Sequence, residues 1–350
     1  MGRTGKIMEE TKIDLIIPWV DGNDPKWLKE KSKYDFTDAD NSSNSAQRFR
    51  DWDLMRYFFR GIEKNMPWIN KVFFVTWGHL PDWLDTNCKK LRIVRHTDYI
   101  PEKYLPTFNS NVIELNYHRI EELSENFILF NDDLFAVGKS SPEDFFKNGL
   151  PCDELVAKTL VNYDPTSYIW HIVLNDMGVI NRYFSGGSKM MPNIDKWVNP
   201  HYGLKTSAMN FSKIFGSRLS SFYDFHIHSC HKKSVFSKLW ELEGDYLDKV
   251  CQNRFRSPFD LSHWMMRYWN LASGNFSPVD MNKIGKYCWF DNADESLKTI
   301  KNEIENRSAK ILVINDTLNG EDEDGFEICK EGIKESFEKI FPEKSSFEKG

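Results

Sequence analysis

Short apolar runs alternate along this chain with stretches long enough for a helix. Four of these runs, at 13–20, 71–76, 91–94 and 127–130, are rich in β-branched or aromatic residues and have the length of strands. Parallel strands need crossover connections of about a dozen residues or more, usually helices, and the segments between these runs are long enough. The sequence therefore predicts an α/β fold with a Rossmann-like, mostly parallel sheet flanked by helices.

The run at 127–130 ends abruptly in Asn131, Asp132 and Asp133. Open α/β sheets bind their ligands beyond the carboxyl ends of their strands, so this polar group is expected in a cleft. Two adjacent carboxylates that are poorly solvated repel each other unless a divalent cation or an oriented ligand phosphate relieves the charge. We therefore predict a metal or diphosphate site here. The alternative is a polar turn in which one aspartate caps the next element.

Two other apolar runs, at 13–20 and 310–314, also end in polar turns. The first breaks at an Asp-Gly turn, which in isolation is most often only a turn. At the carboxyl end of a parallel strand, however, such side chains face the same cleft as the pair described above. The candidate residues in these two turns are Asp21, Asp24, Asn315 and Asp316.

Positive and ionisable groups accompany the acidic turns. From Arg48 to Ile62, apolar residues recur at helical spacing with arginines between them, and one near the helix start could reach a diphosphate. Histidines are dense at 226–231, which is compatible with a zinc site or with ordinary polar positions before a helix that begins near Lys233. At 254–260, Ser257 is expected to cap another helix. A further helix is predicted at 112–123, capped by Asn109 or Ser110.

Composition limits the partners and the compartment. A formal charge of −6 and a pI near 5.9 argue against a general polyanion-binding surface, so nucleic acid is not an expected partner. Six cysteines lie far apart with no CxxC pair, which suits a reducing compartment. Residues 1–12 lack the apolar core of a signal peptide, and no window approaches the roughly 20 apolar residues of a membrane span. We expect a cytoplasmic protein, at most peripheral to the inner face of the membrane.

Three further segments differ in composition from the predicted strands and helices, and each carries its own prediction. Residues 35–47 contain almost no apolar side chains and are predicted to form a mobile loop, with a lid as one role. Residues 151–225 are assigned to a mainly helical insertion or substrate cover. The acidic stretch at 320–331 resembles a calcium loop, but Gly320 stands where the first ligand belongs, which favours a solvated acidic loop.

Four stretches of the chain together resemble the four characteristic regions of the Stealth family. They contain IPWVDGNDPKW; RFRDWDLMRYFFRGIEKNMPWINKVFFVTWG with LPTFNSNVIE and FILFNDD; HSCHKKS with NRFRSPFD; and KILVINDT with FPEKSSFE. These stretches occupy about 13–25, 48–146, 226–274 and 310–348. The family includes bacterial capsular polysaccharide phosphotransferases and the eukaryotic enzyme that adds N-acetylglucosamine-1-phosphate to lysosomal glycoproteins. The extra modules of the longer eukaryotic members are not found in this sequence, which favours a bacterial enzyme of surface polysaccharide synthesis.

The resemblance implies transfer of a hexose-1-phosphate from a UDP-hexose or UDP-N-acetylhexosamine to an oligosaccharide or polysaccharide hydroxyl, with release of UMP. It implies one GT-A-like catalytic domain over 1–350, with a nucleotide-sugar-binding half at 13–150 and a second catalytic half at 226–350. Arg256 would stabilise charge on the transferring phosphorus, and a histidine or Asp21 would accept the proton of the acceptor. Carried over by motif, the catalytic residues are Asp21, His228, His231 and Arg256, the substrate-binding residues are Asp24, Arg48, Asn131, Asn315 and Asp316, and Asp132 and Asp133 bind Mg²⁺ or Mn²⁺.

Two other functions fit parts of this pattern. A metal-dependent GT-A-type glycosyltransferase would use the same acidic pair but direct the acceptor to the anomeric carbon and release UDP. A carbohydrate-binding protein without activity would use the 12 tryptophans, but it has little need for so many ionisable groups at strand ends. As a polysaccharide enzyme, the protein is also expected to associate peripherally with membrane-bound capsule machinery.

Overall fold

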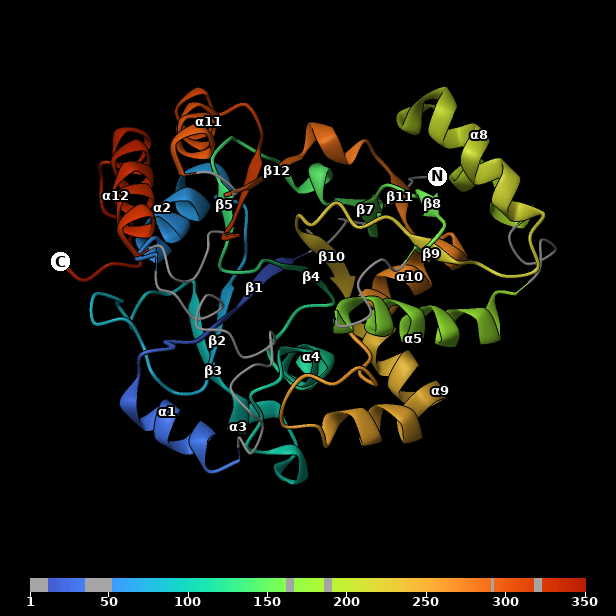
Figure 1. The fold of residues 1–350 in the computed structure, drawn as a ribbon, viewed down its shortest axis with the longest axis horizontal. Coiled ribbons are helices and arrows are strands. Elements are labelled where there is room, and N and C mark those ends of the chain that lie inside the picture. The colour runs from blue at the N-terminus through green and yellow to red at the C-terminus, as the bar shows by residue number, and fades with distance from the viewer. Residues whose placement is uncertain (1–11, 35–51, 162–166, 186–190, 291–292, 318–322) are drawn as a thin grey trace, which may run out of the picture.

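The computed structural model describes residues 12–34, 52–161, 167–185, 191–290, 293–317 and 323–350. Arg48, the predicted loop at 35–47 and residues 320–322 of the acidic stretch lie outside these residues. A central sheet with helices on both sides forms the middle of the fold (Figure 1).

The central sheet has five strands in the order β10–β4–β1–β2–β3. Four are parallel: β1 (Ile13–Trp19), β2 (Val72–Thr76), β3 (Leu91–Arg95) and β4 (Asn126–Leu129). β10 (Ser229–Lys232) runs antiparallel to β4 at one edge. The α/β class and the mostly parallel sheet are confirmed, because the predicted apolar runs became these parallel strands.

Alternate side chains of the central strands enter two different hydrophobic cores. Leu15 and Phe74 pack into one core, and their neighbours Ile16 and Phe73 pack into the other. All four are at most 1% exposed. Burial on both faces explains why these strands have continuous apolar sequences instead of alternating polar and apolar residues.

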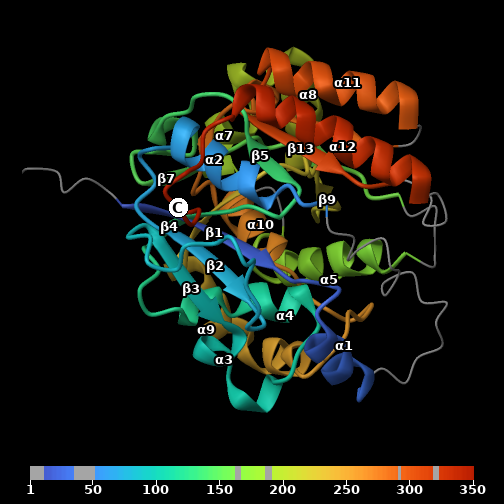
Figure 2. The ribbon, with the colours of Figure 1, turned by 90° about the vertical axis from the view of Figure 1, so that its left-hand side faces the viewer.

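Three helices cover the first face, together with a second sheet. They are α2 (Met55–Asn65), α11 (Ala293–Asn306) and α12 (Glu323–Ile340), and Figure 2 shows them on one side of the central sheet. The second sheet has the order β12–β13–β5, made of β12 (Gly285–Trp289), β13 (Ile311–Asn315) and β5 (Leu134–Ala136). Because β5 follows β4 after a short turn, this turn connects the two sheets.

The other face is covered by helices from the middle of the chain. These are α3 (His96–Tyr99), α4 (Ser110–Leu115), α5 (Tyr168–Tyr183), α9 (Lys233–Cys251) and α10 (Trp264–Ser273). α1 (Pro25–Ser32) follows the turn after β1; its N-cap is Asp24, whose side chain accepts the N–H groups of Lys26 and Trp27.

Residues 151–225 are mainly helical, as predicted, but they also contain short strands. α7 (Ile194–Trp197) and α8 (Gly203–Ile214) accompany α5 in this segment. The strand pairs are small: β6 (Phe146–Lys147) and β11 (Ser277–Pro278) flank β7 (Leu150–Asp153), while β8 (Ala157–Lys158) pairs with β9 (Ser221–Phe222).

Two expected helices differ from the structure. The helix predicted at 112–123 ends at Leu115, because the next residue, Asn116, turns its side-chain amide back to the carbonyl of Val112 at 2.8 Å. The helix expected to begin beside Ser257 begins only at Trp264. Ser257 instead closes a turn, in which its carbonyl accepts the N–H of Asp260 at 3.0 Å.

Candidate active site

The parallel strands change direction between β1 and β4. β2 and β3 extend the sheet on one side of β1, whereas β4, which follows them in sequence, lies on the other side. Such a switch point leaves a crevice beyond the carboxyl ends of the two strands, where open α/β sheets bind ligands. The turn containing Asp21 follows β1, and the turn containing Asn131, Asp132 and Asp133 follows β4. The fold therefore places both predicted polar turns at this crevice.

The second sheet adds the polar end of β13 to the same place. β5 begins at Leu134, which pairs with Val313 of β13 in antiparallel register. The N–H of Ile314 donates to the carbonyl of Asp133 at 2.9 Å. Asn315 therefore lies beside the acidic turn, although more than 180 residues separate the two in sequence. Asp316 follows directly after it.

The surroundings of the Asp133 carboxyl group disfavour its charged form. Its Oδ1 atom is buried and has no hydrogen-bond partner. Burial and, after it, the charge of the neighbouring Asp132 carboxylate together raise the pKa of Asp133 to about 7. A cation beside the two side chains would relieve both effects.

The acidic pair offers two carboxylate ligands for a divalent cation. Among the described residues, no group of three or more His, Cys, Asp or Glu side chains is arranged to hold a metal ion. Mg²⁺ is usually bound by one or two carboxylates and completes its shell with water and substrate phosphates. Asp132 and Asp133 match that type of site, and their affinity for metal should depend on a bound diphosphate.

His79 is a site residue that the sequence reasoning missed. Its Nε2 atom accepts the backbone N–H of Asp21 at 2.8 Å, and its Nδ1 atom lies 3.6 Å from a carboxylate oxygen of Asp24. Acceptance at Nε2 leaves the ring proton on Nδ1, directed toward Asp24. His79 thereby ties the turn after β1 to the end of β2. The motif TWGHLP carries no local signal of this contact, which spans 58 residues.

His226 is an exposed histidine whose charge interacts with that of Asp133 in the acidic turn. Its ring packs edge-on against Tyr287 of β12 at 5.1 Å, and its Nδ1 atom lies 3.7 Å from Asp224. The hydrogen bond to Asp224 raises the pKa of His226, and the charge of Asp133 acts in the same direction. The sequence drew attention to this cluster of histidines, but the predicted catalytic residues were its other two members.

Those two members, His228 and His231, lie in the protein core. His228 is 4% exposed and contacts the rings of Phe130 and Phe145, and neither of its ring nitrogens has a hydrogen-bond partner. His231 is fully buried on β10, with its Nε2 atom 3.2 Å from Nδ1 of His263. Burial lowers the pKa of both residues, to about 3 for His228. Their roles as proton acceptors remain predictions, and each role would require the ring to become accessible.

Arg256 belongs to a second polar group, formed where two of the sequence motifs meet. Its guanidinium donates to Oγ of Ser110 at 2.7 and 3.2 Å and to the hydroxyl of Tyr168. Asp260, in the same motif, accepts from the side chain of Asn109 at 2.8 Å. The segments LPTFNS and NRFRSPFD are therefore structural partners, which holds the guanidinium in a defined direction.

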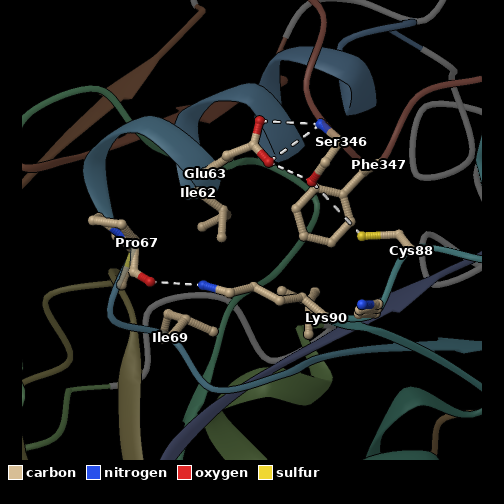
Figure 3. A pocket seen from close by; sticks show the side chains of 11 residues that line it. Ile62, Glu63, Pro67, Ile69, Cys88, Lys90, Ser346 and Phe347 are labelled. Carbon is tan, nitrogen blue, oxygen red and sulfur yellow. Dashed lines mark hydrogen bonds between the residues drawn. The ribbon is translucent and has the colours of Figure 1, made fainter. Parts of the chain in front are cut away.

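The pocket of about 370 Å³ shown in Figure 3 lies at the opposite edge of the sheet and is not part of this site. Val72 at the amino end of β2 and Lys90 just before β3 line it. One wall is fastened by Glu63, which accepts both the backbone N–H and the hydroxyl of Ser346.

We expect that replacing His228 with Phe makes the protein less sensitive to acid. Because the pKa of His228 is about 3 in the folded protein and about 6.5 when unfolded, only the unfolded chain binds this proton between those values. The contribution of His228 to stability is therefore complete above pH 6.5 and falls with pH below it. Between pH 7 and pH 5, wild type should lose about 2 kcal/mol more unfolding free energy than His228→Phe.

Urea titrations at the two pH values measure this difference, with the exposed His201→Phe as the matched control. Equal acid sensitivity of wild type and His228→Phe would mean that His228 is hydrated in solution. Turnover of the same folded variant tests the predicted catalytic role separately, because Phe can neither accept nor donate a proton.

A mostly parallel, Rossmann-like sheet with polar turns at its switch point defines an α/β protein of the class that binds its ligands beyond the carboxyl ends of the strands. The sequence models of Stealth protein CR1, conserved region 1, and Stealth protein CR2, conserved region 2, match residues 11–38 and 48–152. The capsular polysaccharide phosphotransferase WcwK of Streptococcus pneumoniae is 43% identical over 340 residues, which cover 96% of this chain and 99% of that protein.

Relatives from other species are also named as polysaccharide phosphotransferases. The receptor polysaccharide phosphotransferase WefC of Streptococcus oralis is 36% identical over 341 residues, covering 96% of this chain and 99% of that protein. The exopolysaccharide phosphotransferase cps2G of Lactiplantibacillus plantarum is 34% identical over 338 residues, covering 96% of both chains. The chain belongs to the Stealth family, and it is a transferase of the phosphotransferase class. No helix in the described part of the chain is long and apolar enough to cross a membrane.

Proposed function

We propose that this enzyme transfers a hexose-1-phosphate from a UDP-hexose or UDP-N-acetylhexosamine to a hydroxyl group of an oligosaccharide or polysaccharide. Its relatives are named as phosphotransferases of capsular and extracellular polysaccharides, which supports a phosphodiester product. The observation that carries the proposal is the meeting of three polar strand ends at the switch point of the sheet, where a nucleotide diphosphate fits. A GT-A-like arrangement of donor and metal belongs to this proposal.

The chemistry leaves the sugar itself untouched. The acceptor oxygen attacks the phosphorus next to the sugar, and the bond from that phosphorus to the bridging oxygen breaks. UMP leaves with this oxygen, while the C1–O bond of the sugar and its anomeric configuration stay intact. The proton of the acceptor passes to a base, for which Asp21, His228 and His231 are proposed. Of these, only Asp21 is partly exposed beside the strand ends.

The remaining residues bind and orient the donor. Arg256, held by Ser110 and Tyr168, is proposed to stabilise the negative charge that develops on the transferring phosphorus. Mg²⁺ or Mn²⁺ at Asp132 and Asp133 would neutralise the diphosphate. The proposed donor-binding residues are Asp24, Arg48, Asn131, Asn315 and Asp316.

We place the reaction in the cytoplasm, at membrane-bound capsule machinery. All six cysteines are free in the structure, and five of them are buried. Free thiols suit a reducing compartment. Nucleotide-sugar donors, rather than nucleic acid, are the proposed anionic partners.

The released nucleotide tests the proposed function. With UDP-N-acetylglucosamine or another UDP-hexose, Mg²⁺ and an oligosaccharide acceptor, we expect UMP to form in step with a phosphodiester, detected by chromatography and phosphorus NMR. A reaction without acceptor controls for hydrolysis of the donor. Acceptor-dependent UDP without a diester resonance would show that the same cleft works as a glycosyltransferase.

A further inference from the structure

Helix α8 packs against the protein through a face anchored by polar contacts. Its buried side chains are Ser207, Asn210 and Ile214. Asn210 is fully buried and makes three hydrogen bonds: its amide donates to the carbonyls of Leu155 at 2.7 Å and Trp197 at 3.0 Å, and its oxygen accepts the N–H of Ala157 at 2.8 Å. Ser207 donates to a further backbone carbonyl at 3.0 Å. These bonds hold the helix firmly in place with little use of apolar packing.

One exposed flank of the same helix is apolar. Leu204 is 92% exposed, Phe211 46% and Phe215, the C-cap residue, 69%. With the exposed Ala208, their spacing of three and four residues places them in one stripe along the helix. The rings of Phe211 and Phe215 pack edge to face at 5.0 Å, so they form a continuous patch. A surface helix normally turns such a stripe toward the core and exposes its polar side. In α8 the stripe instead lies along a flank, between the buried side chains and the exposed Lys205 and Ser212, and stays exposed to solvent.

The charged side chains of α8 and of the turn that follows it are all basic. Residues 196–223 contain four basic side chains and no aspartate or glutamate, although the whole chain has a formal charge of −6. Lys205 and Arg218 are exposed near the two ends of the helix, and Lys213 donates to Thr159 on its flank. Figure 1 shows α8 at the periphery of the fold, where such a surface is accessible.

We propose that α8 docks the enzyme onto an anionic lipid bilayer. Apolar side chains enter the interface between headgroups and acyl chains, while lysine and arginine beside them meet anionic headgroups, which is how interfacial helices bind. A symmetric contact between two copies of α8 is disfavoured, because it would bring the two basic surrounds together. The surface is independent of the strand-end site, so the inference holds whatever the donor sugar is.

Vesicle flotation tests this inference with the full-length enzyme. The probes are vesicles of equal parts phosphatidylglycerol and phosphatidylcholine, compared with vesicles of phosphatidylcholine alone. We expect at least about tenfold more protein bound to the anionic vesicles at low salt, and a decrease as salt rises. The triple variant Leu204→Ser, Phe211→Ser, Phe215→Ser should lower binding about tenfold or more, with unchanged turnover on a soluble acceptor.

Control variants distinguish vesicle binding through this surface from nonspecific adsorption. Ile328→Ser removes an apolar side chain that is 61% exposed on α12 and should leave vesicle binding unchanged. Lys205→Gln with Arg218→Gln should weaken binding to anionic vesicles only. If the triple variant melts early, Phe215→Ser alone serves, because this residue lies at the end of the helix.

Three outcomes would overturn the inference. One is wild-type protein that does not float with anionic vesicles, and another is a triple variant that floats as well as wild type. The third is a wild-type dimer, seen by analytical ultracentrifugation, that the triple variant dissociates without a change in lipid binding. That result would assign the stripe to a second copy of this chain. None of these outcomes depends on which nucleotide the enzyme releases, so failure here is distinguishable from failure of the proposed reaction.

Discussion

Replacing Asp133 with Asn is expected to reduce turnover by about a hundredfold or more while the protein remains folded. The change preserves the shape of the side chain and removes its charge. A cation held by two carboxylates and a diphosphate would lose one of its protein ligands. The unfolding free energy should stay the same or increase, because Asp133 is a carboxyl whose burial and acidic neighbour disfavour its charged form.

UMP release at saturating Mg²⁺ measures turnover, and circular dichroism melting measures stability. Asp85→Asn is the matched control, since Asp85 lies in an exposed turn, where its carboxylate accepts the backbone N–H of Asn87 at 2.9 Å and the side-chain amide of the same residue at 3.2 Å. Wild-type turnover in Asp133→Asn would show that the acidic turn is only a cap. In that event both variants should behave alike.

Replacing Arg256 with Ala is expected to reduce turnover by about a thousandfold, the scale of losses seen when an arginine that stabilises phosphoryl transfer is removed. Arg256→Lys should recover little of this loss. A single ammonium group cannot reproduce the planar set of bonds that the guanidinium makes to Ser110 and Tyr168. Affinity for the donor should fall much less than turnover, because the proposed interaction is strongest in the transition state.

Arg254→Ala provides the matched control. Arg254 lies two residues away in the same motif and packs over the ring of Tyr34 at 4.7 Å, so its removal takes away a neighbouring arginine of equal charge. We expect near wild-type turnover for this variant. A large loss in Arg254→Ala with normal turnover in Arg256→Ala would move the proposed role to Arg254. Ser110→Ala should give an intermediate loss of about tenfold if it only orients Arg256.

The agreement between sequence and structure is greatest for the parallel strands. β1, β2 and β4 were predictable because strands buried on both faces are apolar along most of their length, and this pattern is local. β3, at the edge of the sheet, was predictable from its short apolar run at 91–94. The polar residues that follow the carboxyl ends of β1 and β4 were equally recognisable in the sequence. Asp133 and Asn315 could be predicted as candidate site residues without a structure, because parallel strands carry their ligand sites at the carboxyl edge.

The histidines show where local patterns fail. The sequence HIHSCH reads as polar, but its last three residues lie in β10, which pairs with β4 and takes His231 into the core. His226, before that strand, remains exposed. Whether a histidine is buried or accessible depends on the strand pairing, and a four-residue strand contains too few residues to reveal its pairing.

By itself, the sequence determined the α/β class, the acidic strand ends and the family, because each depends on the order and spacing of residues along the chain. Only the tertiary structure decided which polar groups meet. It placed His79 beside Asp21, Arg256 beside Ser110, and the end of β13 beside Asp133. It also left the apolar stripe of α8 exposed to solvent. A helix shows its amphipathic pattern in sequence, but which side faces the protein depends on partners such as the backbone carbonyls that bind Asn210, which the rest of the fold supplies.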